Sequence, residues 1–332
     1  MSDLLAKCYP ALGNTLSKLA IADLPTPASK YVLSLPTGDI EIAVKHDEAT
    51  SSLYGGNKVR KLEYLLQRAR QRGATRVATF GAAGSNHALA TAMHARALGL
   101  ECTCFLSGQK VTPDVARTLD AHRQLGTEII RWGGSIDQVA LFRQHLQGRN
   151  TWVIPLGGTC WLGALGFVNA GLELARQVDD GLVGKPDRVY IACGTTGSAA
   201  GLALGIAAAR LDATVHAVQV ADYPFSSETK LRRLMAKTLS LVSRMDPTFT
   251  ARDWASRIVW RDEFLAGGYA REDEATVAAV ATARDQLGLS LETTYTGKAM
   301  AAMLHDLQTT NLPDEYFMFW NTYNAQPLPV AG

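Results

Sequence analysis

The sequence predicts an α/β protein with two interleaved three-layer αβα domains, each built on a mostly parallel sheet. Three observations lead to this prediction. Short apolar runs alternate with helical segments along most of the chain, the 29 glycines fall at the joints between those segments, and no linker-like tract divides the 332 residues. Alternating strands and helices are typical of parallel sheets that are covered on both faces. A chain of this length is also near the size at which one core divides into two.

The clearest strand and helix units lie in the first half of the chain. Thr112 is placed to cap one of these helices and Pro113 to occupy its first turn, which fixes that start well. In chain order we expect a strand over 75–80, a loop over 81–85, a helix over 86–98, a strand over 101–106, a helix over 113–125, a strand over 128–132, a helix near 136–146 and a strand over 152–155.

The same alternation continues through the second half. We expect a helix over 162–178, a strand over 188–192, a helix reaching Ala209, and strands over 215–220, 258–260 and 316–319 with helices between them. Residues 62–158 then form a smaller α/β domain, inserted into a larger domain made of 1–61 and 159–332.

Composition argues against several classes of function. The 33 Lys and Arg residues nearly balance the 31 Asp and Glu residues, a formal net charge of +2, so we expect no nucleic-acid partner. Uncharged apolar stretches such as residues 277–283 are far shorter than the roughly 20 residues that cross a bilayer. The first residues show no signal-peptide pattern. We therefore expect a cytoplasmic protein with no membrane partner. We also expect its five cysteines to be buried, reduced thiols that bind no metal.

A glycine-containing turn before residue 58 could present a reactive lysine. Lys58 falls in the first turn of an expected helix, where Asn57 can act as the cap and Lys61 shares the same face. A helix N-terminus and a neighbouring cation both disfavour an ammonium group and should lower the pKa of Lys58. A lysine with a lowered pKa can form a Schiff base with a carbonyl compound. A solvated basic patch at a helix start explains the same residues.

A second loop, residues 192–201, is suited to a phosphate group. It is rich in Gly and Thr, follows a strand and opens an Ala-rich helix, so hydroxyls and backbone N–H groups converge there. It has neither the G-x-G-x-x-G pattern nor a Walker A sequence, which argues against a dinucleotide or a nucleoside triphosphate. A phosphate monoester beside an activated lysine suggests pyridoxal phosphate as the cofactor.

Two other turns present polar side chains at helix starts. Ser85, Asn86 and His87 occupy one of them, where anions bind readily, although capping alone would explain the first two. In the other, Tyr295 could exchange a proton with a ligand and Thr296 could hydrogen-bond a ring nitrogen. A Gly-containing turn with ordinary capping is the alternative for this second turn.

Five separated segments carry further information: Gly55–Tyr64, Ser85–His87, Ile154–Gly158, Leu162–Phe167 and Tyr295–Met300. In this order, over roughly residues 40–325, they resemble the 1-aminocyclopropane-1-carboxylate deaminase and D-cysteine desulfhydrase family. The resemblance implies a pyridoxal-phosphate enzyme of the tryptophan-synthase-β-like fold, which is fold type II. It also implies a homodimer that acts on a small amino-acid substrate.

The resemblance assigns residues to the cofactor. Lys58 would hold pyridoxal phosphate as a Schiff base and act as a catalytic base once it is released. Asn86 would contact the side of the ring that carries the 3-hydroxyl, and Thr296 would meet the pyridine nitrogen. The phosphate would be held by Thr195, Thr196, Gly197 and Ser198.

The resemblance also assigns residues to the substrate. Ser85 and His87 would lie near its carboxylate, together with Asn86. Tyr295 would face the substrate as a catalytic residue. Tyr269 would line the same pocket, although Ala270 follows it where the family has Gly.

Thr296 helps to choose a reaction. The resemblance implies that the cyclopropane deaminases carry Glu at this position and that the desulfhydrases carry Thr. A neutral hydroxyl cannot keep the pyridine nitrogen charged, so we expect α,β-elimination from a β-substituted amino acid. The products would be a 2-oxo acid such as pyruvate and ammonia, with sulfide when the substrate is cysteine. A cyclopropane deaminase or another related lyase is one alternative. A catalytically inactive homologue that binds the cofactor or an amino acid is the other.

Three positions depart from the family pattern. Gly84 stands where the family has Gln, and Leu89 and Ala90 stand where it has Arg and Gln. Near the C-terminus, Asn-Thr-Tyr-Asn at 321–324 replaces His-Thr-Gly-Gly, which places the ring of Tyr323 where the family keeps glycine. We therefore expect an altered substrate pocket.

Overall fold

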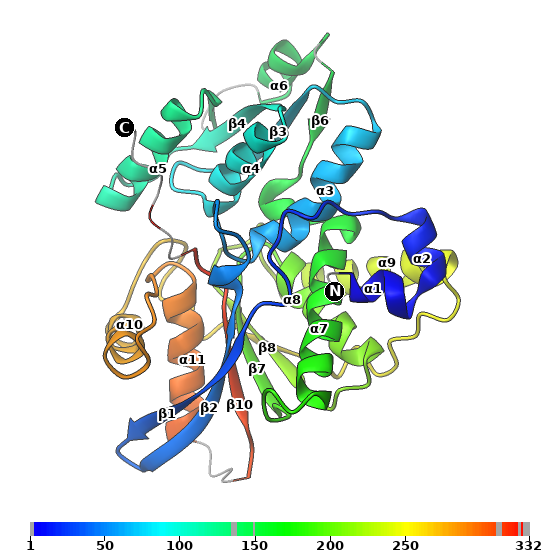
Figure 1. Cartoon of the computed structure of the whole chain (residues 1–332). Coiled ribbons are helices and arrows are strands. Elements are labelled where there is room, and N and C mark those ends of the chain that lie inside the picture. The colour runs from blue at the N-terminus through cyan, green and yellow to red at the C-terminus, as the bar shows by residue number, and fades with distance from the viewer. Residues whose placement is uncertain (1–2, 134–137, 149, 310–313, 325–326, 328–332) are drawn as a thin grey trace.

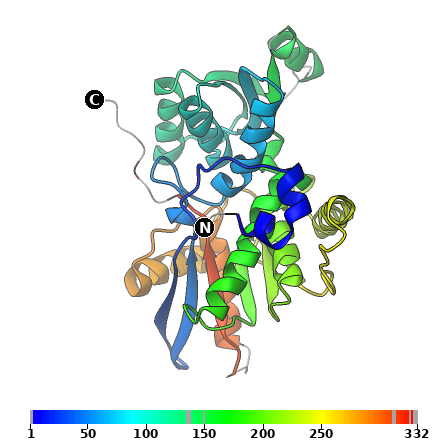
Figure 2. The same ribbon diagram turned by 45° about the vertical axis from the view of Figure 1, so that its right-hand side comes forward.

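A computed structural model describes residues 3–133, 138–148, 150–309, 314–324 and 327. Its described part contains a larger and a smaller β-sheet, which lie one above the other with helices packed against both (Figures 1 and 2). The larger sheet has the order β1-β2-β10-β7-β8-β9 and the smaller one the order β5-β4-β3-β6. Every pairing is parallel except that of β1 with β2, which confirms the predicted α/β class with mostly parallel sheets.

The strands of the larger sheet come from both ends of the chain. They are β1 (Ala28–Leu35), β2 (Gly38–His46), β7 (Arg188–Cys193), β8 (Thr214–Gln219), β9 (Ile258–Arg261) and β10 (Phe317–Asn321). The smaller sheet is built from one continuous stretch and contains β3 (Arg76–Ala82), β4 (Glu101–Ser107), β5 (Glu128–Trp132) and β6 (Thr151–Val153). The antiparallel hairpin of β1 and β2 was not among the elements expected from the sequence.

The described helices for which residues were predicted begin and end close to those residues, whereas α1 and α2 were not expected. They are α1 (Leu4–Cys8), α2 (Pro10–Thr15), α3 (Lys58–Gln71), α4 (Asn86–Ala97), α5 (Pro113–Gln124), α6 (Gln138–Leu146), α7 (Trp161–Asp179), α8 (Gly197–Ala208), α9 (Glu228–Met245), α10 (Glu274–Leu287) and α11 (Thr296–Thr309), with short 3-10 turns η1 (Asp47–Ala49) and η2 (Leu156–Gly158). The predicted start of α6 near residue 136 lies outside the described residues. None of the described helices is long and apolar enough to cross a membrane.

Alternate residues of the central strand β10 face opposite sides of the larger sheet. Phe317 and Phe319 join the core beneath α10 and α11, while Met318 and Trp320 join the core beneath α7 and α8. All four side chains are buried. A parallel strand that is apolar on both faces needs helices on both sides, and the two helix layers in Figure 1 supply them.

Glycines bring α7 and α8 into close contact behind the larger sheet. A Cβ atom added at Gly201 of α8 would lie 2.2 Å from the carbonyl oxygen of Ala164 in α7. One added at Gly205 would lie 2.3 Å from the carbonyl oxygen of Val168. The backbones of the two helices therefore touch, and this contact fixes where α8 begins.

A buried network of charges anchors the start of α3. The guanidinium group of Arg60 lies 2.8 Å from Asp47 and 2.9 Å from Glu173, and the ammonium group of Lys45 lies 2.6 Å from Glu173. Thr26 accepts a further hydrogen bond from Arg60 at 3.0 Å. The two cations and two acids compensate each other's charge in a buried setting, and together they tie α3 to β2, η1 and α7.

The cysteines only partly match the expectation. Cys102 and Cys104 are buried in β4 and Cys193 is buried at the end of β7, as expected for core thiols. Cys160 is partly exposed and Cys8 is exposed, so the expectation was wrong for Cys8. All five are free thiols.

Candidate active site

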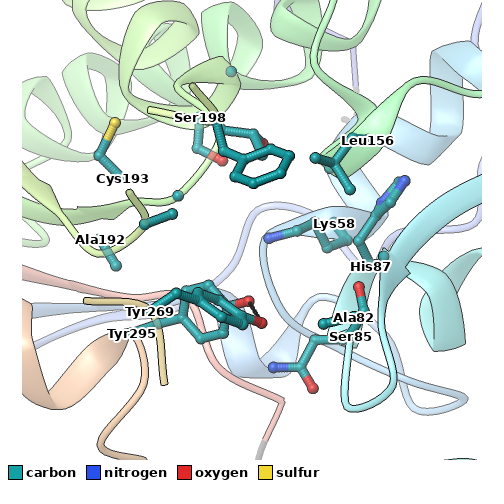
Figure 3. A pocket seen from close by; sticks show the side chains of 18 of the residues that line it. Lys58, Ala82, Ser85, His87, Leu156, Ala192, Cys193, Ser198, Tyr269 and Tyr295 are labelled. Carbon is teal, nitrogen blue, oxygen red and sulfur yellow. Dashed lines mark hydrogen bonds between the residues drawn. The ribbon is translucent and has the colours of Figure 1, made fainter. Parts of the chain in front are cut away.

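A cavity of about 560 Å³ lies where the carboxyl ends of strands in both sheets meet the N-terminal ends of α3, α4 and α8. This is the position at which open α/β sheets bind their ligands. Its lining includes Lys58, Ser85, His87, Tyr269 and Tyr295. In Figure 3 the amine of Lys58 points into this space, towards the side on which the two tyrosine hydroxyls meet.

Lys58 is held at the cavity by its neighbour in the chain. Its Nζ donates a 2.7 Å hydrogen bond to Asn57 Oδ1, and Asn57 Nδ2 donates to Ser198 Oγ at 3.0 Å. Asn57 therefore links α3 to α8, and it does not cap α3 as the sequence suggested.

The pKa of Lys58 is lowered to about 8, in the direction expected from the sequence. The main cause is desolvation by the surrounding protein, which Glu292 partly opposes, rather than crowding by other cations. Arg60 acts elsewhere, because its guanidinium group is taken up by Asp47 and Glu173. A sizeable share of Lys58 is consequently neutral near physiological pH, which is the state needed for a nucleophile or a base.

The start of α8 forms a cradle for an anion. Thr196 adopts a left-handed conformation with φ of 72°, and its buried Oγ1 has no hydrogen-bond partner among the described residues. Gly197 follows at the first helical position, next to the N–H groups that a helix start leaves unpaired. Thr195 Oγ1 lies 2.7 Å from Thr159 Oγ1 at the same end of the cavity. A buried hydroxyl without a partner beside a helix N-terminus fits a phosphate group.

A second lysine lies beside this cradle. Lys61 Nζ donates to the carbonyl oxygen of Gly157 at 3.1 Å, and a Cβ atom on Gly197 would lie only 3.0 Å from it. Burial, and then the charge of Lys58, hold the pKa of Lys61 well below its usual range. A dianion at the start of α8 would reverse this effect and favour the charged ammonium. The sequence placed Lys61 on the face of Lys58 but did not connect it with the phosphate.

The start of α4 gathers the three residues expected near a carboxylate. Ser85 Oγ accepts a hydrogen bond from the Ala88 N–H at 3.2 Å and thus caps the helix, and Asn86 Oδ1 accepts one from the Tyr54 hydroxyl at 3.0 Å. His87 Nε2 lies 2.9 Å from Thr79 Oγ1. Burial, with Lys58 and Lys61, holds the pKa of His87 well below its usual value, so this imidazole is neutral.

Tyr269 and Tyr295 form a hydroxyl pair on the opposite side of the cavity. Their oxygens lie 2.6 Å apart, and the backbone N–H of Tyr269 is held by Asp222 at 2.9 Å. Burial raises the pKa of both phenols, which therefore remain protonated. A protonated pair at this distance can pass a proton between the two oxygens.

Thr296, which the resemblance assigns to the pyridine nitrogen, lies at the start of α11. It is fully buried, its Oγ1 lies 3.0 Å from Glu292 Oε1, and it is not among the residues that line the cavity. Glu292 caps the start of α11 by accepting the N–H groups of residues 294–296, and this arrangement draws the threonine hydroxyl away. Glu292 and Thr322 line the cavity instead.

The three departures from the family pattern have different outcomes. Tyr323 lines the cavity, as its bulk suggested. Gly84 does not line the cavity. It lies against α5 instead, where a Cβ atom on Gly84 would be 2.9 Å from Val115 Cγ2. Leu89 and Ala90 are buried inside α4 and contribute to the core rather than to the cavity.

Several lining residues were not expected from the sequence. Phe80, Trp132 and Leu156 lie near or just after the carboxyl ends of strands in the smaller sheet, and Thr322 directly follows β10 of the larger one. Their common signal is position at the carboxyl end of a strand, which becomes informative once the sheet order is known.

The model of one protein family, described as pyridoxal-phosphate dependent enzyme, matches residues 24–318. The chain belongs to this family. Pyridoxal phosphate is accordingly its cofactor, and the unpaired Thr196 hydroxyl, the start of α8 and the Lys58 amine are suited to that group.

Individual relatives agree with this assignment. D-cysteine desulfhydrase of Klebsiella pneumoniae (strain 342) is 32% identical over 314 residues, covering 90% of either chain, and that of Salmonella newport (strain SL254) is 32% identical over 310 residues, again covering 90% of either chain. Among solved structures, an ACC deaminase homologue matches with a TM-score of 0.79 and 26% identity, covering 95% of this chain and 94% of that one. A fungal L-serine ammonia-lyase from Rhizomucor miehei shares the fold, with a TM-score of 0.60 and 18% identity, covering 92% of this chain and 94% of its own. These matches confirm the predicted fold type.

Proposed function

We propose that this enzyme catalyses α,β-elimination from a small β-substituted amino acid, releasing a 2-oxo acid and ammonia, in the manner of a D-cysteine desulfhydrase. The observation that carries the proposal is the Lys58 amine, whose pKa is lowered to about 8, in one cavity with a phosphate cradle and a pair of protonated tyrosines. The relatives named D-cysteine desulfhydrase, aligned over 90% of the chain, support this choice.

The described residues suggest how the cofactor is held. The phosphate would lie at the start of α8 on Thr195, Thr196, Gly197 and Ser198, with Lys61 as its counter-charge. Asn86 would contact the side of the ring that carries the 3-hydroxyl. Thr296 remains the residue proposed for the pyridine nitrogen, and Thr322, which lines the cavity, is a second candidate.

The proposed chemistry then falls to three groups of side chains. When bound, pyridoxal phosphate withdraws electrons from the substrate α-carbon and so makes the α-proton removable. The start of α4, with Ser85, Asn86 and neutral His87, would hold the substrate carboxylate through N–H and side-chain donors. Lys58 would accept the α-proton as a neutral amine. Tyr295, relayed by Tyr269, would donate a proton to the departing β-substituent.

Lys58→Ala tests the proposal directly. We expect the variant to lose the visible absorption of the lysine-bound cofactor and to lose oxo-acid release by about 1000-fold or more, since both nucleophile and base are removed. Lys237→Ala, at an exposed position on α9, is the control and should behave as the wild type. A Lys58→Ala enzyme that keeps the band, or borohydride treatment that fixes no pyridoxyl group to Lys58, would contradict the assignment.

A substrate screen separates the alternatives. D- and L-cysteine, β-chloroalanine, cysteate and 1-aminocyclopropane-1-carboxylate are compared for release of 2-oxo acid and ammonia. Release of pyruvate from cysteine or β-chloroalanine supports elimination. Release of 2-oxobutanoate from the cyclopropane substrate alone would assign the deaminase reaction, and binding without turnover on every compound would indicate an inactive homologue.

We further propose that the chain is a cytoplasmic homodimer in which residues 62–158 form the smaller domain and 1–61 with 159–332 the larger. The resemblance supports the dimer, the five free thiols support a reducing compartment, and strands β3 to β6 all fall within the proposed smaller domain. The near balance of charges, with a net value of +2, gives no support to a nucleic-acid partner. Sedimentation of the cofactor-loaded protein tests the dimer, because a monomeric mass at micromolar concentration would exclude it.

A further inference from the structure

One end of the cavity is formed by aromatic rings. Phe80 and Trp132 line it, and their ring centroids lie 5.1 Å apart in an edge-to-face arrangement. Phe105 packs beneath both, at 5.2 Å from Phe80 and 5.4 Å from Trp132, and Phe142 of α6 lies 6.1 Å from Phe80. We call Phe80 and Trp132 the aromatic wall. The rings behind it hold it in place, because well-packed aromatic side chains have little freedom to move.

The position of the aromatic wall follows from the register of the smaller sheet. Ala82 of β3 pairs with Ser107 of β4, which pairs with Trp132 of β5, so these three residues form a row at the carboxyl ends of the strands. Phe80 lies two residues earlier on β3 and therefore shares the face of Ala82. Leu156, just after β6, adds a further apolar side chain to the lining.

None of the described residues that line this end of the cavity carries a charge. The charged side chains of the lining are those of Lys58, Lys61, Asp222 and Glu292, which belong to α3 and to segments that follow β8 or precede α11. Phe80 and Trp132 are both partly exposed, so apolar ring surface faces the cavity. Covering such surface with an apolar ligand group is favourable by about 25 cal/mol per Å².

The aromatic wall also adjoins the carboxylate site. Gly81 follows Phe80 directly, and a Cβ atom on Gly81 would lie 2.6 Å from Ser85 Oγ, so the backbone next to the wall touches the start of α4. Ser85, Asn86 and His87 line the same cavity as Phe80 and Trp132. An amino acid whose carboxylate is held at α4 therefore shares this cavity with the wall.

We infer that the aromatic wall receives the β-substituent of the substrate, and that the substrates are amino acids with an aryl or large alkyl thioether at the β-carbon. This inference rests on the proposed elimination reaction. With S-phenylcysteine and water the products are pyruvate, ammonia and thiophenol. The Cα–H and Cβ–S bonds break, and the sulfur leaves with the bonding pair and a proton. The β-carbon then takes up a proton, and water replaces the amine at the α-carbon, so that the Cα–N bond breaks, ammonia leaves and the water oxygen becomes the oxo oxygen. An anionic substituent such as the sulfonate of cysteate finds no cation among the described residues that line this end.

Binding tests the subsite without relying on turnover. Phenylalanine and alanine, as both enantiomers, carry the same amino and carboxylate groups and no leaving group, and they differ by one phenyl ring. Calorimetry on the cofactor-loaded enzyme should show that the favoured enantiomer of phenylalanine binds at least 10-fold more tightly than alanine. Trp132→Ala should remove most of this difference and change the affinity for alanine less than 2-fold.

Two variants control for a general effect of removing a large side chain. Trp132→Phe keeps an aromatic ring and should retain most of the preference for phenylalanine. Trp254→Ala, at a partly buried position that does not line the cavity, should leave the preference unchanged. Equal affinities for the two amino acids, or a Trp132→Ala variant that weakens both alike, would overturn the inference.

Turnover distinguishes failure of the subsite from failure of the proposed function. We expect kcat/KM for S-phenylcysteine to exceed that for cysteine at least 10-fold in the wild type and to fall selectively in Trp132→Ala through KM. Turnover of cysteine and β-chloroalanine without any preference for the aryl compound refutes the subsite and leaves elimination standing. Tight, Trp132-dependent binding of phenylalanine without turnover of any cysteine derivative upholds the subsite and refutes elimination.

Discussion

Lys58 combines two opposing effects on one amine. Desolvation disfavours its charged form and is the larger effect, while the carboxylate of Glu292 favours that form. The balance leaves the pKa at about 8, compared with an ordinary value of 10.5, so the neutral amine accumulates well below the pH at which a free lysine would lose its proton.

This balance predicts how the cofactor-free chain captures pyridoxal phosphate. Because only the neutral amine attacks the aldehyde, the rate of capture should rise with pH and level off above about 8. The visible absorption that follows mixing at a series of pH values measures this rate. Glu292→Gln removes the group that raises the pKa, so its midpoint should lie below that of the wild type. A wild-type midpoint above 10 would show that Lys58 is not desolvated.

At this scale the sequence identified the residue types well and their contacts less well. Lys58, Ser85, Asn86, His87 and Tyr295 were found because their chemistry is visible in the sequence, and Tyr269 was found through the resemblance; the structure brings all six into one cavity. The direction of the Thr296 hydroxyl was not expected, because it depends on Glu292, four residues earlier, which caps α11 and contacts that hydroxyl. Such local competition for hydrogen bonds cannot be read from residue spacing alone.

The contact of α7 with α8 shows what a helix gains from glycine in a packed interface. Gly201 lowers the intrinsic helix propensity of α8, yet its missing Cβ lets the backbone approach Ala164 within contact distance. This approach places the start of α8, with Thr196 and Gly197, at the cavity.

Gly201→Ala should therefore destabilise the protein. Helix propensity alone would favour alanine by about 1 kcal/mol, but a Cβ atom 2.2 Å from the Ala164 carbonyl oxygen forces the helices apart. We expect the free energy of unfolding to fall by about 1–3 kcal/mol, measured by urea denaturation. Gly108→Ala is the matched control, because nothing lies within 4 Å of its added Cβ, and its effect should be close to zero. A Gly201→Ala protein as stable as the wild type would show that the two helices can separate freely.

The parallel strands and their helices were predictable because apolar runs and helix-start signals are local. The β1–β2 hairpin was missed, although the turn Pro36-Thr37-Gly38 stands between two runs rich in β-branched and aromatic residues. No element was expected before the helix that begins near Lys58, so this local signal was missed.

Across the whole molecule, the cavity is shared between the two sheets. Helix α4 connects β3 to β4 of the smaller sheet, and α8 connects β7 to β8 of the larger sheet. The first turns of both helices face the same cavity (Figure 3). A cofactor held by both would join the two halves of the structure.

Cofactor binding should therefore stabilise the fold as a unit. At a free concentration 100 times its dissociation constant, pyridoxal phosphate should add about 2.7 kcal/mol to the free energy of unfolding, seen as a higher Tm. Hydrogen exchange should slow at the first turns of both α4 and α8. Protection at α8 alone would mean that the smaller sheet takes no part in holding the cofactor. Lys58→Ala, which cannot form the covalent bond, should show a smaller rise.

The order of strands in the larger sheet was beyond sequence reasoning. Nothing local in residues 317–321 indicates that β10 lies between β2 and β7, since this depends on which edges remain available after the rest of the chain has packed. The two-sheet arrangement was anticipated from length and alternation, whereas the neighbours of each strand were not.

The central place of β10 has a consequence for synthesis on the ribosome. The smaller sheet uses residues 76–153 and can form while translation continues, but β2 and β7 have no strand between them until residue 321 has emerged. Until then the nascent chain exposes two unpaired strand edges, and Thr322 and Tyr323 have not yet closed the cavity. The interval before β10 inserts is thus the period in which this protein is most exposed to aggregation and most in need of a chaperone.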